Sequence, residues 1–163
     1  MNNENVLKKV MRLSVVAALY VALTFALSFI AYGNVQFRVA EILVLLCFFK
    51  KDYSISLIIG CAIVNLFSPL GILDVAIGTL ATTLSVICIM YSKRLYVSII
   101  YPVLFNALLV GGLLTFVYDT PFILNILSVG FGELVVMIFG VIMFKYLRQN
   151  NHFISLIKAD QNI

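Results

Sequence analysis

Long apolar runs are the feature that most constrains this chain of 163 residues. A helix needs about 20 apolar residues to cross the roughly 30 Å of hydrocarbon in a bilayer, and six runs approach that length. The chain is 63% hydrophobic and 11% charged, whereas typical soluble domains are about 25% charged. A soluble domain of this size could not hide so much apolar surface. We therefore predict an all-α integral membrane protein, and the net charge of +4 is no evidence for nucleic-acid binding.

The six predicted transmembrane spans are joined by brief connections that leave no room for a soluble domain. They cover residues 13–32, 39–49, 53–67, 70–91, 95–117 and 121–147, and the second is distinctly short. We treat residues 1–163 as one six-helix transmembrane domain. Lys8, Lys9 and Arg12 before the first run also resemble the start of a signal peptide. Because that run is long enough to span and no convincing cleavage site follows it, we expect a retained helix.

The basic residues predict the orientation of the chain. With the N-terminus inside, only Arg38 of the 11 lysines and arginines lies outside. The ten cytoplasmic ones are Lys8, Lys9, Arg12, Lys50, Lys51, Lys93, Arg94, Lys145, Arg148 and Lys158. Cytoplasmic loops are enriched in such residues, so both termini are predicted to be cytoplasmic. The polar tail after Leu147, which includes His152, is expected to be a surface segment without chemistry of its own.

A few polar residues remain where lipid penalises them, by at least about 2.5 kcal/mol for an ionisable side chain. Nearly all fall in the outer half of the membrane. They are Arg38, Glu41, Asp74 and Glu133, with the amides Gln36, Asn65, Asn106 and Asn125. At helical rise, Glu133 lies roughly 18 Å beyond Pro121 and Asn106 roughly 16 Å before Val117, so both reach near the midplane. We predict a polar pocket that opens to the outside and is floored by Glu133 and Asn106.

Most of these residues also have a structural interpretation. Arg38 and Glu41 are three apart on one helical face and would neutralise each other. Asp74 follows Ser68-Pro69, a plausible N-cap and first helical position, and would complement the helix dipole. The amides Asn65 and Asn125 would serve as caps or interhelical hydrogen bonds.

Glu133 differs because no Lys or Arg of the chain lies at its depth. It must be protonated, hydrogen-bonded to a neighbour such as Asn106, or in contact with a ligand. Asp119, in an outer connection, is expected to be a solvated loop residue.

Small residues give a second signal. Ser14, Ala18, Ala22 and Ala26 recur every four residues and leave one helical stripe without bulky side chains, which lets another helix approach closely. The stripe serves either as packing within this bundle or as a docking surface for another membrane subunit. A lean polar face, formed by Asp74, Gly78, Thr82 and Ser85, is expected to line the interior and lead to the pocket.

Several chemistries have no signature here. The chain has no Walker P-loop, no HExxH or GxSxG motif, and no membrane-embedded histidine cluster. Cys47, Cys61 and Cys88 lack CxxC spacing and are expected to be small core residues. We predict neither a cofactor nor a metal site and no enzymatic activity. A ligand pocket without its own energy source implies a partner.

Two segments resemble a known family. They are residues 35–41, Val-Gln-Phe-Arg-Val-Ala-Glu, and the stretch from Asn65-Leu66-Phe67-Ser68-Pro69 through Asp74 to Gly78-Thr79-Leu80-Ala81-Thr82. These segments resemble the QueT family of queuosine-precursor transporters, and the resemblance covers nearly the whole chain. These are similar to the substrate-binding S components of energy-coupling factor (ECF) transporters. The stripe at Ala18, Ala22 and Ala26 is similar to the small-residue motif with which S components dock on their coupling subunit.

The resemblance implies a six-helix S component that captures a 7-deazaguanine, such as preQ0, preQ1 or queuine, from outside. It would associate with a transmembrane coupling protein and two cytoplasmic ATPases and topple in the membrane to release the substrate inward. The missing P-loop agrees with this division of labour.

The chemistry of such a ligand assigns expected roles to the polar residues. A guanine-like edge presents two adjacent N–H donors, which a carboxylate accepts in bidentate fashion, and Glu133 is the first candidate. The ring carbonyl needs a donor such as arginine or an amide, which makes Arg38, Asn106, Gln36 and Asn65 candidates. A flat base would stack on Phe37, Tyr32 or Phe67, and an aminomethyl cation would meet Glu41 or Asp74. The alternatives are an S component for another purine-like base or vitamin, and a non-transporting accessory subunit; an intramembrane hydrolase lacks a recognisable nucleophile–base pair.

Overall fold

Helices make up most of the described chain. The computed structural model describes residues 6–31 and 36–157. In chain order, the elements are α1 (Val6–Ala26), α2 (Ser28–Ala31), the 3-10 helix η1 (Val39–Leu45), α3 (Leu46–Phe49), α4 (Tyr53–Asn65), α5 (Ile72–Met90), α6 (Ile100–Phe105), the π-helix η2 (Asn106–Val110), α7 (Gly111–Tyr118), α8 (Phe122–Leu147) and α9 (Asn151–Ile157). The predicted all-α class is confirmed for these residues, which contain no strand.

Three helical runs are long and apolar enough to cross a membrane among the described residues. They are α5, the continuous run Ile100–Tyr118 made by α6, η2 and α7, and α8. The segments Val39–Phe49 and α4 are apolar but shorter. The first predicted span differs most, because its helix begins at Val6, ends at Ala26 and is followed by the short α2. The count of six spans therefore stays a prediction.

The short second span begins as a 3-10 helix. Its bounds, Val39–Phe49, agree with the prediction, but the seven residues of η1 are wound more tightly than an α-helix. A 3-10 helix rises about 2.0 Å per residue against about 1.5 Å in an α-helix. The extra rise helps a short segment to cross the centre of the bundle.

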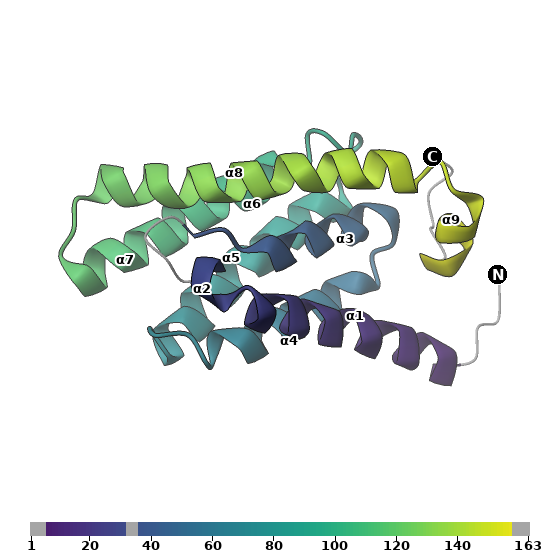
Figure 1. The fold of residues 1–163 in the computed structure, drawn as a ribbon, viewed down its shortest axis with the longest axis horizontal. Coiled ribbons are helices and arrows are strands. Elements are labelled where there is room, and N and C mark those ends of the chain that lie inside the picture. Colours follow the sequence, from purple (N-terminus) through teal and green to yellow (C-terminus); the bar gives the residue numbers. More distant parts are fainter. Residues whose placement is uncertain (1–5, 32–35, 158–163) are drawn as a thin grey trace.

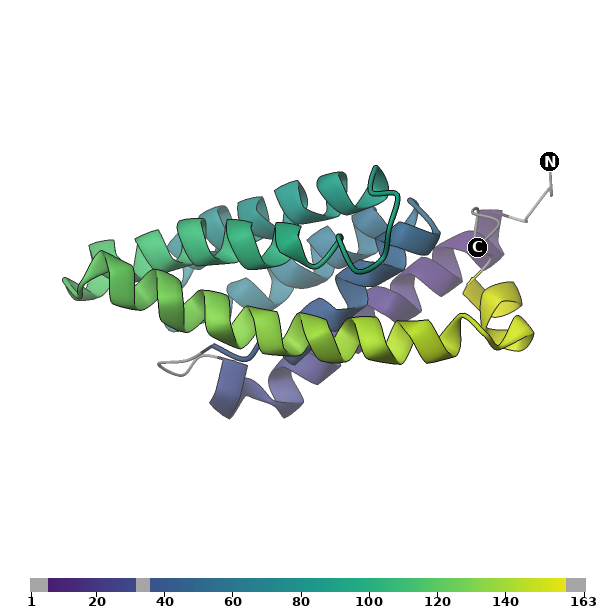
Figure 2. The same ribbon diagram turned by 90° about the horizontal axis from the view of Figure 1, so that it is seen from above.

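The helices form an elongated bundle. In Figure 1, α8 runs along one side of the molecule near α6, while α1 lies with α4 on the opposite side and η1, α3 and α5 lie between them. The connection between α7 and α8 lies at one end, and α9 and the start of α1 lie at the other (Figures 1 and 2).

Contacts among polar and aromatic residues gather at the end of the bundle that holds α9. Lys9 forms an ion pair with Asp52 at 2.8 Å, and the ammonium group of Lys51 lies 4.7 Å from the ring centroid of Tyr91. The Tyr53 hydroxyl donates a hydrogen bond to the carbonyl oxygen of Ile157, at 3.2 Å. These contacts bring the start of α1, the α3–α4 turn, the end of α5 and α9 together.

The tail after Leu147 is more structured than predicted. It includes α9, which folds back so that Ile157 is buried and the ring of Phe153 lies 6.1 Å from that of Phe144. The tail lies at the surface as expected, since most of its described residues are exposed, but the helix and the packing of Phe153, Ile154 and Ile157 against the core were not predicted. His152 is exposed.

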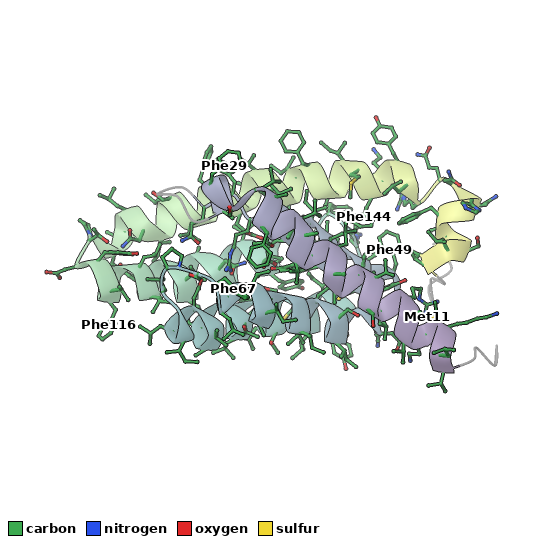
Figure 3. The ribbon with its side chains drawn as sticks, turned by 60° about the horizontal axis from the view of Figure 1, so that its bottom comes forward. Met11, Phe29, Phe49, Phe67, Phe116 and Phe144 are labelled. Carbon is green, nitrogen blue, oxygen red and sulfur yellow. The ribbon has the colours of Figure 1, made fainter. Side chains whose placement is uncertain are left out.

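Large apolar side chains lie both inside and outside the bundle. The rings of Phe49 and Phe144 pack in the core with centroids 5.4 Å apart. Phe29, Phe67 and Phe116 point outward (Figure 3), with exposed fractions of 76%, 68% and 82%. Soluble monomers seldom expose apolar surface on this scale, whereas it suits contact with lipid.

The neighbouring glycines Gly111 and Gly112 predict opposite responses to substitution. A Cβ at Gly111 would lie 3.1 Å from the backbone of Ile126 in α8, whereas one at Gly112 would meet only the Phe122 ring, at 3.7 Å. We expect Gly111→Ala to lower the free energy of unfolding by about 1–3 kcal/mol, the usual cost of overpacking. The matched control Gly112→Ala should leave it unchanged or raise it, because alanine favours helix. Thermal unfolding of the purified protein in detergent measures both; equal responses would contradict the close approach of α7 and α8.

Candidate functional site

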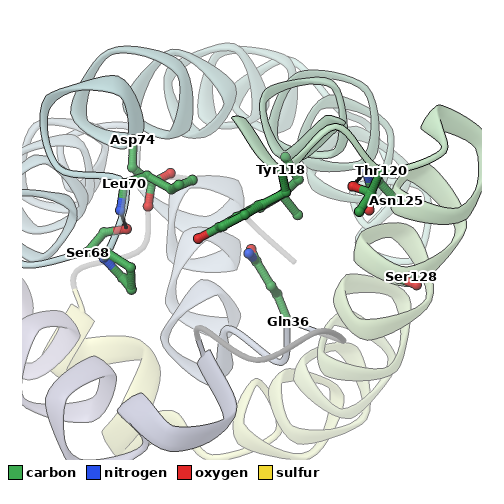
Figure 4. Close-up of a pocket in the computed structure, with 10 residues that line it drawn as sticks. Gln36, Ser68, Leu70, Asp74, Tyr118, Thr120, Asn125 and Ser128 are labelled. Carbon is green, nitrogen blue, oxygen red and sulfur yellow. Dashed lines mark hydrogen bonds between the residues drawn. The ribbon is translucent and has the colours of Figure 1, made fainter. Parts of the chain in front are cut away.

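A cavity of about 540 Å³ lies at the end of the bundle where α7 turns into α8. This volume falls in the range of small-molecule sites. Its described lining residues are Gln36, Ser68, Pro69, Leu70, Asp74, Leu114, Tyr118, Thr120, Asn125 and Ser128. Figure 4 shows Asp74, Leu70 and Ser68 on one side and Thr120, Asn125 and Ser128 on the other, with the Tyr118 ring extending between them near Gln36.

The turn between α4 and α5 positions Asp74. Gly71 is the N-cap of α5 and has φ +54°, a conformation that favours glycine. The Ser68 hydroxyl accepts a hydrogen bond from the backbone N–H of Leu70 at 3.2 Å. The predicted helix start at Ser68-Pro69 is therefore wrong, because these residues form the preceding turn. Asp74 nevertheless lies in the first turn of α5, where a carboxylate complements the helix dipole.

Beside the cavity lies a group of buried polar side chains, which we call the buried cluster. Its members come from five different segments and are each 5% exposed or less. They are Arg38, Glu41, Asn65, Asp74, Asn106 and Glu133.

Arg38 links three segments of the chain. Its Nη2 donates a hydrogen bond to Asn65 Oδ1 at 2.5 Å and lies 3.6 Å from Asp74 Oδ2. Asn65 in turn donates to Thr79 Oγ1 at 3.4 Å and to Cys61 Sγ at 3.3 Å. The interhelical role foreseen for Asn65 is therefore confirmed, and Cys61 is buried as expected.

Glu41 forms hydrogen bonds with Tyr20 and Thr82 and not with Arg38. Its Oε1 accepts hydrogen bonds from the Tyr20 hydroxyl at 2.6 Å and from Thr82 Oγ1 at 3.2 Å. The predicted mutual neutralisation of Arg38 and Glu41 is wrong, since Arg38 precedes the helix, with φ −80° and ψ 74°, and reaches α4 and α5 instead.

Several polar atoms of the buried cluster have no hydrogen-bond partner among residues 6–31 and 36–157. These atoms are Arg38 Nη1, Glu41 Oε2, Asp74 Oδ1, Asn106 Oδ1, Asn106 Nδ2 and Glu133 Oε1. The alternative that Glu133 bonds to Asn106 is therefore not what the structure shows. Leaving a buried donor or acceptor unpaired costs about 1–3 kcal/mol, so such a concentration needs an explanation. A bound polar ligand would supply one.

Glu133 and Asn106 do not floor the cavity, contrary to the prediction. Both are only 1% exposed and neither lines the cavity. The two helices approach closely near these residues. A Cβ on Gly130, three residues before Glu133, would lie 3.2 Å from the Cβ of Ala107, which follows Asn106. Asn106 opens the π-helix η2, a rare geometry that is frequent at functional sites.

The predicted residues therefore fall into two sets that meet at Asp74. Gln36 and Asp74 line the cavity, as does Asn125, which also donates to Thr115 and Thr120, both at 2.8 Å. The other five charged or amide candidates lie in the buried cluster. Asp74 belongs to both sets, and the lean polar face that it shares with Gly78, Thr82 and Ser85 is buried as predicted.

The aromatic residues were foreseen less well. Phe37 is half-buried and does not line the cavity, and Phe67 faces outward, where its ring meets that of Phe25 at 5.3 Å. Tyr32 lies outside the described residues. Among the described residues, the aromatic side chain that lines the cavity is Tyr118. Neither Tyr118 nor Tyr20, which donates a hydrogen bond to Glu41, was among the predicted site residues. The burial of Tyr20 could have been predicted, because it lies on the face of α1 opposite the small residues.

The small-residue stripe of α1 faces outward. Ser14, Ala18, Ala22 and Ala26 are all exposed, whereas Tyr20 and Thr24 on the other face are buried. Packing within the described bundle therefore does not explain the stripe. Close packing inside the bundle occurs elsewhere, at Gly60 of α4, where a Cβ would lie 3.3 Å from the Ala17 carbonyl oxygen.

Gly78 is predicted to be indispensable to the buried cluster. A Cβ there would lie 2.8 Å from Asn65 Nδ2 and 2.9 Å from Asp74 Oδ1, so Gly78→Ala must displace polar groups that already have few alternative partners. We expect a loss of about 1–3 kcal/mol in the free energy of unfolding, measured by thermal unfolding in detergent. Gly112→Ala is again the control, and an unfolding temperature unchanged by Gly78→Ala would contradict the contact.

A comparison with known protein families shows which family the chain resembles. The sequence profile of the QueT transporter family matches residues 10–149, most of the chain. The chain belongs to the QueT transporter family. This membership confirms the resemblance and identifies a multi-pass membrane protein of a transporter family, not an enzyme.

Among curated proteins, a QueT relative from Lactococcus lactis subsp. cremoris (strain MG1363) is named "Queuosine precursor transporter QueT". It is 47% identical over 75 residues, which make up 45% of this chain and 44% of that protein. The match thus spans less than half the length of the relative. No solved structure matches the chain. Among the described residues, no group of three or more His, Cys, Asp or Glu side chains is placed to hold a metal ion.

Proposed function

We propose that this chain is the substrate-binding S component of an ECF-type transporter that imports a queuosine precursor, a 7-deazaguanine such as preQ0, preQ1 or queuine. The observation that carries the proposal is the buried cluster, which contains carboxyl, guanidinium and amide atoms that have no hydrogen-bond partner among the described residues. Membership of the QueT transporter family and the name of the Lactococcus relative support a queuosine precursor as the cargo.

The unpartnered atoms include both acceptors for the N–H groups of a deazaguanine and donors for its ring carbonyl. The ring's adjacent N–H groups need a carboxylate, for which Glu133 has a buried vacant oxygen. The ring carbonyl needs a donor, and Arg38 Nη1 and Asn106 Nδ2 are both vacant. Gln36 and Asn65 complete the proposed polar set. Tyr118 lines the cavity, unlike Phe37, and is the proposed aromatic contact for a flat base in the cavity.

The proposed topology is one domain with six transmembrane spans and both termini in the cytoplasm. Its support is the separation of charge from cavity. The ion pair between Lys9 and Asp52 and the ring contact of Lys51 lie at the end of the bundle that holds α9, and the cavity lies at the opposite end. Since basic residues favour the cytoplasmic side, the cavity would open to the outside.

The proposed partners are a transmembrane coupling subunit and two cytoplasmic ATPases. The chain carries no P-loop of its own, and the exposed stripe at Ala18, Ala22 and Ala26 lets a partner helix approach closely. Both observations favour a transporter subunit that depends on others for energy.

Identification of the bound ligand tests the cargo. The chain is purified from its native membrane, and the small molecules released on denaturation are identified by mass spectrometry. We expect a 7-deazaguanine at up to one molecule per chain. Another purine-like base or a vitamin in its place would contradict the cargo while keeping the transporter class, and a folded chain that retains and binds no ligand would favour an accessory subunit.

A further inference from the structure

Two short connections carry a group of basic and tyrosine side chains that the proposed transport function does not use. We call this group the basic–tyrosine patch. It consists of Lys51, from the α3–α4 connection, and Tyr91, Lys93, Arg94 and Tyr96, from the α5–α6 connection, and all five are exposed. The Lys51 ammonium group lies 4.7 Å from the ring centroid of Tyr91 and so joins the two connections. Both connections lie toward the end of the bundle that holds α9 (Figure 2).

The α5–α6 connection holds its part of the patch in a fixed conformation. Leu95 is buried in the main apolar core and anchors the connection there. The carbonyl oxygen of Arg94 accepts hydrogen bonds from the hydroxyls of Ser92 at 3.2 Å and of Ser98 at 3.3 Å. Lys93 and Arg94 are therefore presented outward on an ordered backbone, which lowers the entropic cost of binding a partner there.

The three cations of the patch form no ion pair with any carboxylate that the structure describes. Asp52 is next to Lys51 in the chain, but its carboxylate pairs with Lys9 at 2.8 Å and lies 4.0 Å from Lys50. Like charges that are held near one another repel, and the resulting positive potential attracts anions. A bound anion would relieve this repulsion.

The hydrogen bond between Arg94 and Tyr96 prepares two donors for such an anion. Arg94 Nη1 donates to the Tyr96 hydroxyl at 2.7 Å. Because that hydroxyl oxygen acts as the acceptor, its own proton stays available for donation. The remaining N–H groups of a guanidinium suit the oxygens of a phosphate group.

Apolar surface continues from the patch along both neighbouring helices. Ile55 lies four residues after Lys51, in α4, and Ile87 lies four residues before Tyr91, in α5. The two isoleucines are 61% and 42% exposed. Tyrosines and basic residues that border an apolar surface are typical of the level of lipid headgroups in a membrane protein, which this chain is.

We propose that the basic–tyrosine patch binds the phosphate headgroup of an anionic phospholipid. The headgroup contacts Lys51, Lys93 and Arg94, and the acyl chains lie along the apolar surface that includes Ile55 and Ile87. A free anion or an acidic protein segment would use only the charged half of this surface. The inference is independent of the cargo and of the coupling subunits.

Lipid titration of the purified full-length chain in a neutral detergent tests the proposal. Native mass spectrometry counts the bound molecules of phosphatidylglycerol, which is anionic, and of phosphatidylcholine, which has no net charge. Each basic residue near an anionic membrane surface strengthens attachment about 5-fold. The wild type should therefore bind the first phosphatidylglycerol at least about 10-fold more tightly than phosphatidylcholine. Lys51→Gln combined with Lys93→Gln and Arg94→Gln should reduce this preference to within about 3-fold.

A matched triple variant separates the patch from the net charge of the chain. Lys8→Gln combined with Lys145→Gln and Arg148→Gln also removes two lysines and one arginine from exposed positions, but outside the patch. This control should keep the preference for phosphatidylglycerol. Glycerol phosphate, which carries the anionic charge without acyl chains, should not displace the bound lipid at equal concentration.

Three results would overturn the proposal. Equal binding of the two lipids by the wild type would exclude a lipid and favour an acidic protein surface as the partner of the patch. An undiminished preference in the patch variant, or an equal loss in the control, would show that the patch is not the place of binding. Displacement by glycerol phosphate would show that a free anion suffices.

Discussion

Replacement of Ala22 by leucine is expected to reduce precursor uptake by the assembled transporter to background while leaving ligand binding by the purified chain unchanged. Ala22 is exposed in the middle of the stripe that includes Ala18 and Ala26. A leucine there would hold a partner helix away, and helix association in lipid depends mainly on such close packing. Uptake of labelled preQ1 by cells that contain the coupling subunit and ATPases measures the effect.

A matched substitution controls for the added bulk. Ala76 is also exposed, but it lies on α5 and outside the stripe. Ala76→Leu should therefore preserve both uptake and binding. Normal uptake by the Ala22→Leu variant would show that the stripe is not the docking surface.

Replacement of Arg38 is expected to lower both the stability of the chain and its affinity for the ligand. Arg38 is buried, bonded to Asn65 and close to Asp74. Arg38→Met leaves the Asp74 carboxyl group buried without its cation, and breaking a buried pair in this way costs about 3–5 kcal/mol of stability. It also removes a donor proposed for the ring carbonyl, so affinity for preQ1 should fall at least about 10-fold.

A double substitution separates the two roles of Arg38. Arg38→Met combined with Asp74→Leu removes the whole pair, and apolar replacement of buried ion pairs is often neutral for stability. The double variant should recover thermal stability in detergent but not ligand binding. Arg148→Met, which removes an exposed arginine near the end of α8, is the control and should change neither. Recovery of binding by the double variant would show that Arg38 acts only as a structural residue.

The helices could be predicted from the sequence to within a few residues where apolar runs are long. The predicted span 121–147 agrees with α8, which begins one residue later, at Phe122. The agreement is close because this apolar run is continuous and ends at charged residues. The 3-10 form of η1 and the π-helix η2 were not foreseen. Both depend on tertiary packing, which leaves no periodic signal in a single sequence.

The polar residues of the candidate site could be singled out from the sequence, but their arrangement could not. Rarity of polar residues in apolar runs singled out Arg38, Glu41 and Glu133. Partners such as Tyr20 and Thr82 were not assigned to Glu41, since a tyrosine or threonine in a span costs little and is not conspicuous. The pairing of Arg38 with Asp74 in preference to Glu41 depends on the backbone before η1, which sequence spacing alone does not reveal.

The central claim, that the buried cluster binds a 7-deazaguanine, is tested most directly by equilibrium binding of labelled preQ1 to the purified wild type and to Glu133→Ala. The two hydrogen bonds assigned to the Glu133 carboxylate are each worth about 1.5–3 kcal/mol. We therefore predict one site per chain in the wild type and an affinity at least about 100-fold weaker in the variant. Absence of binding by the folded wild type, or undiminished binding by Glu133→Ala, would contradict the account.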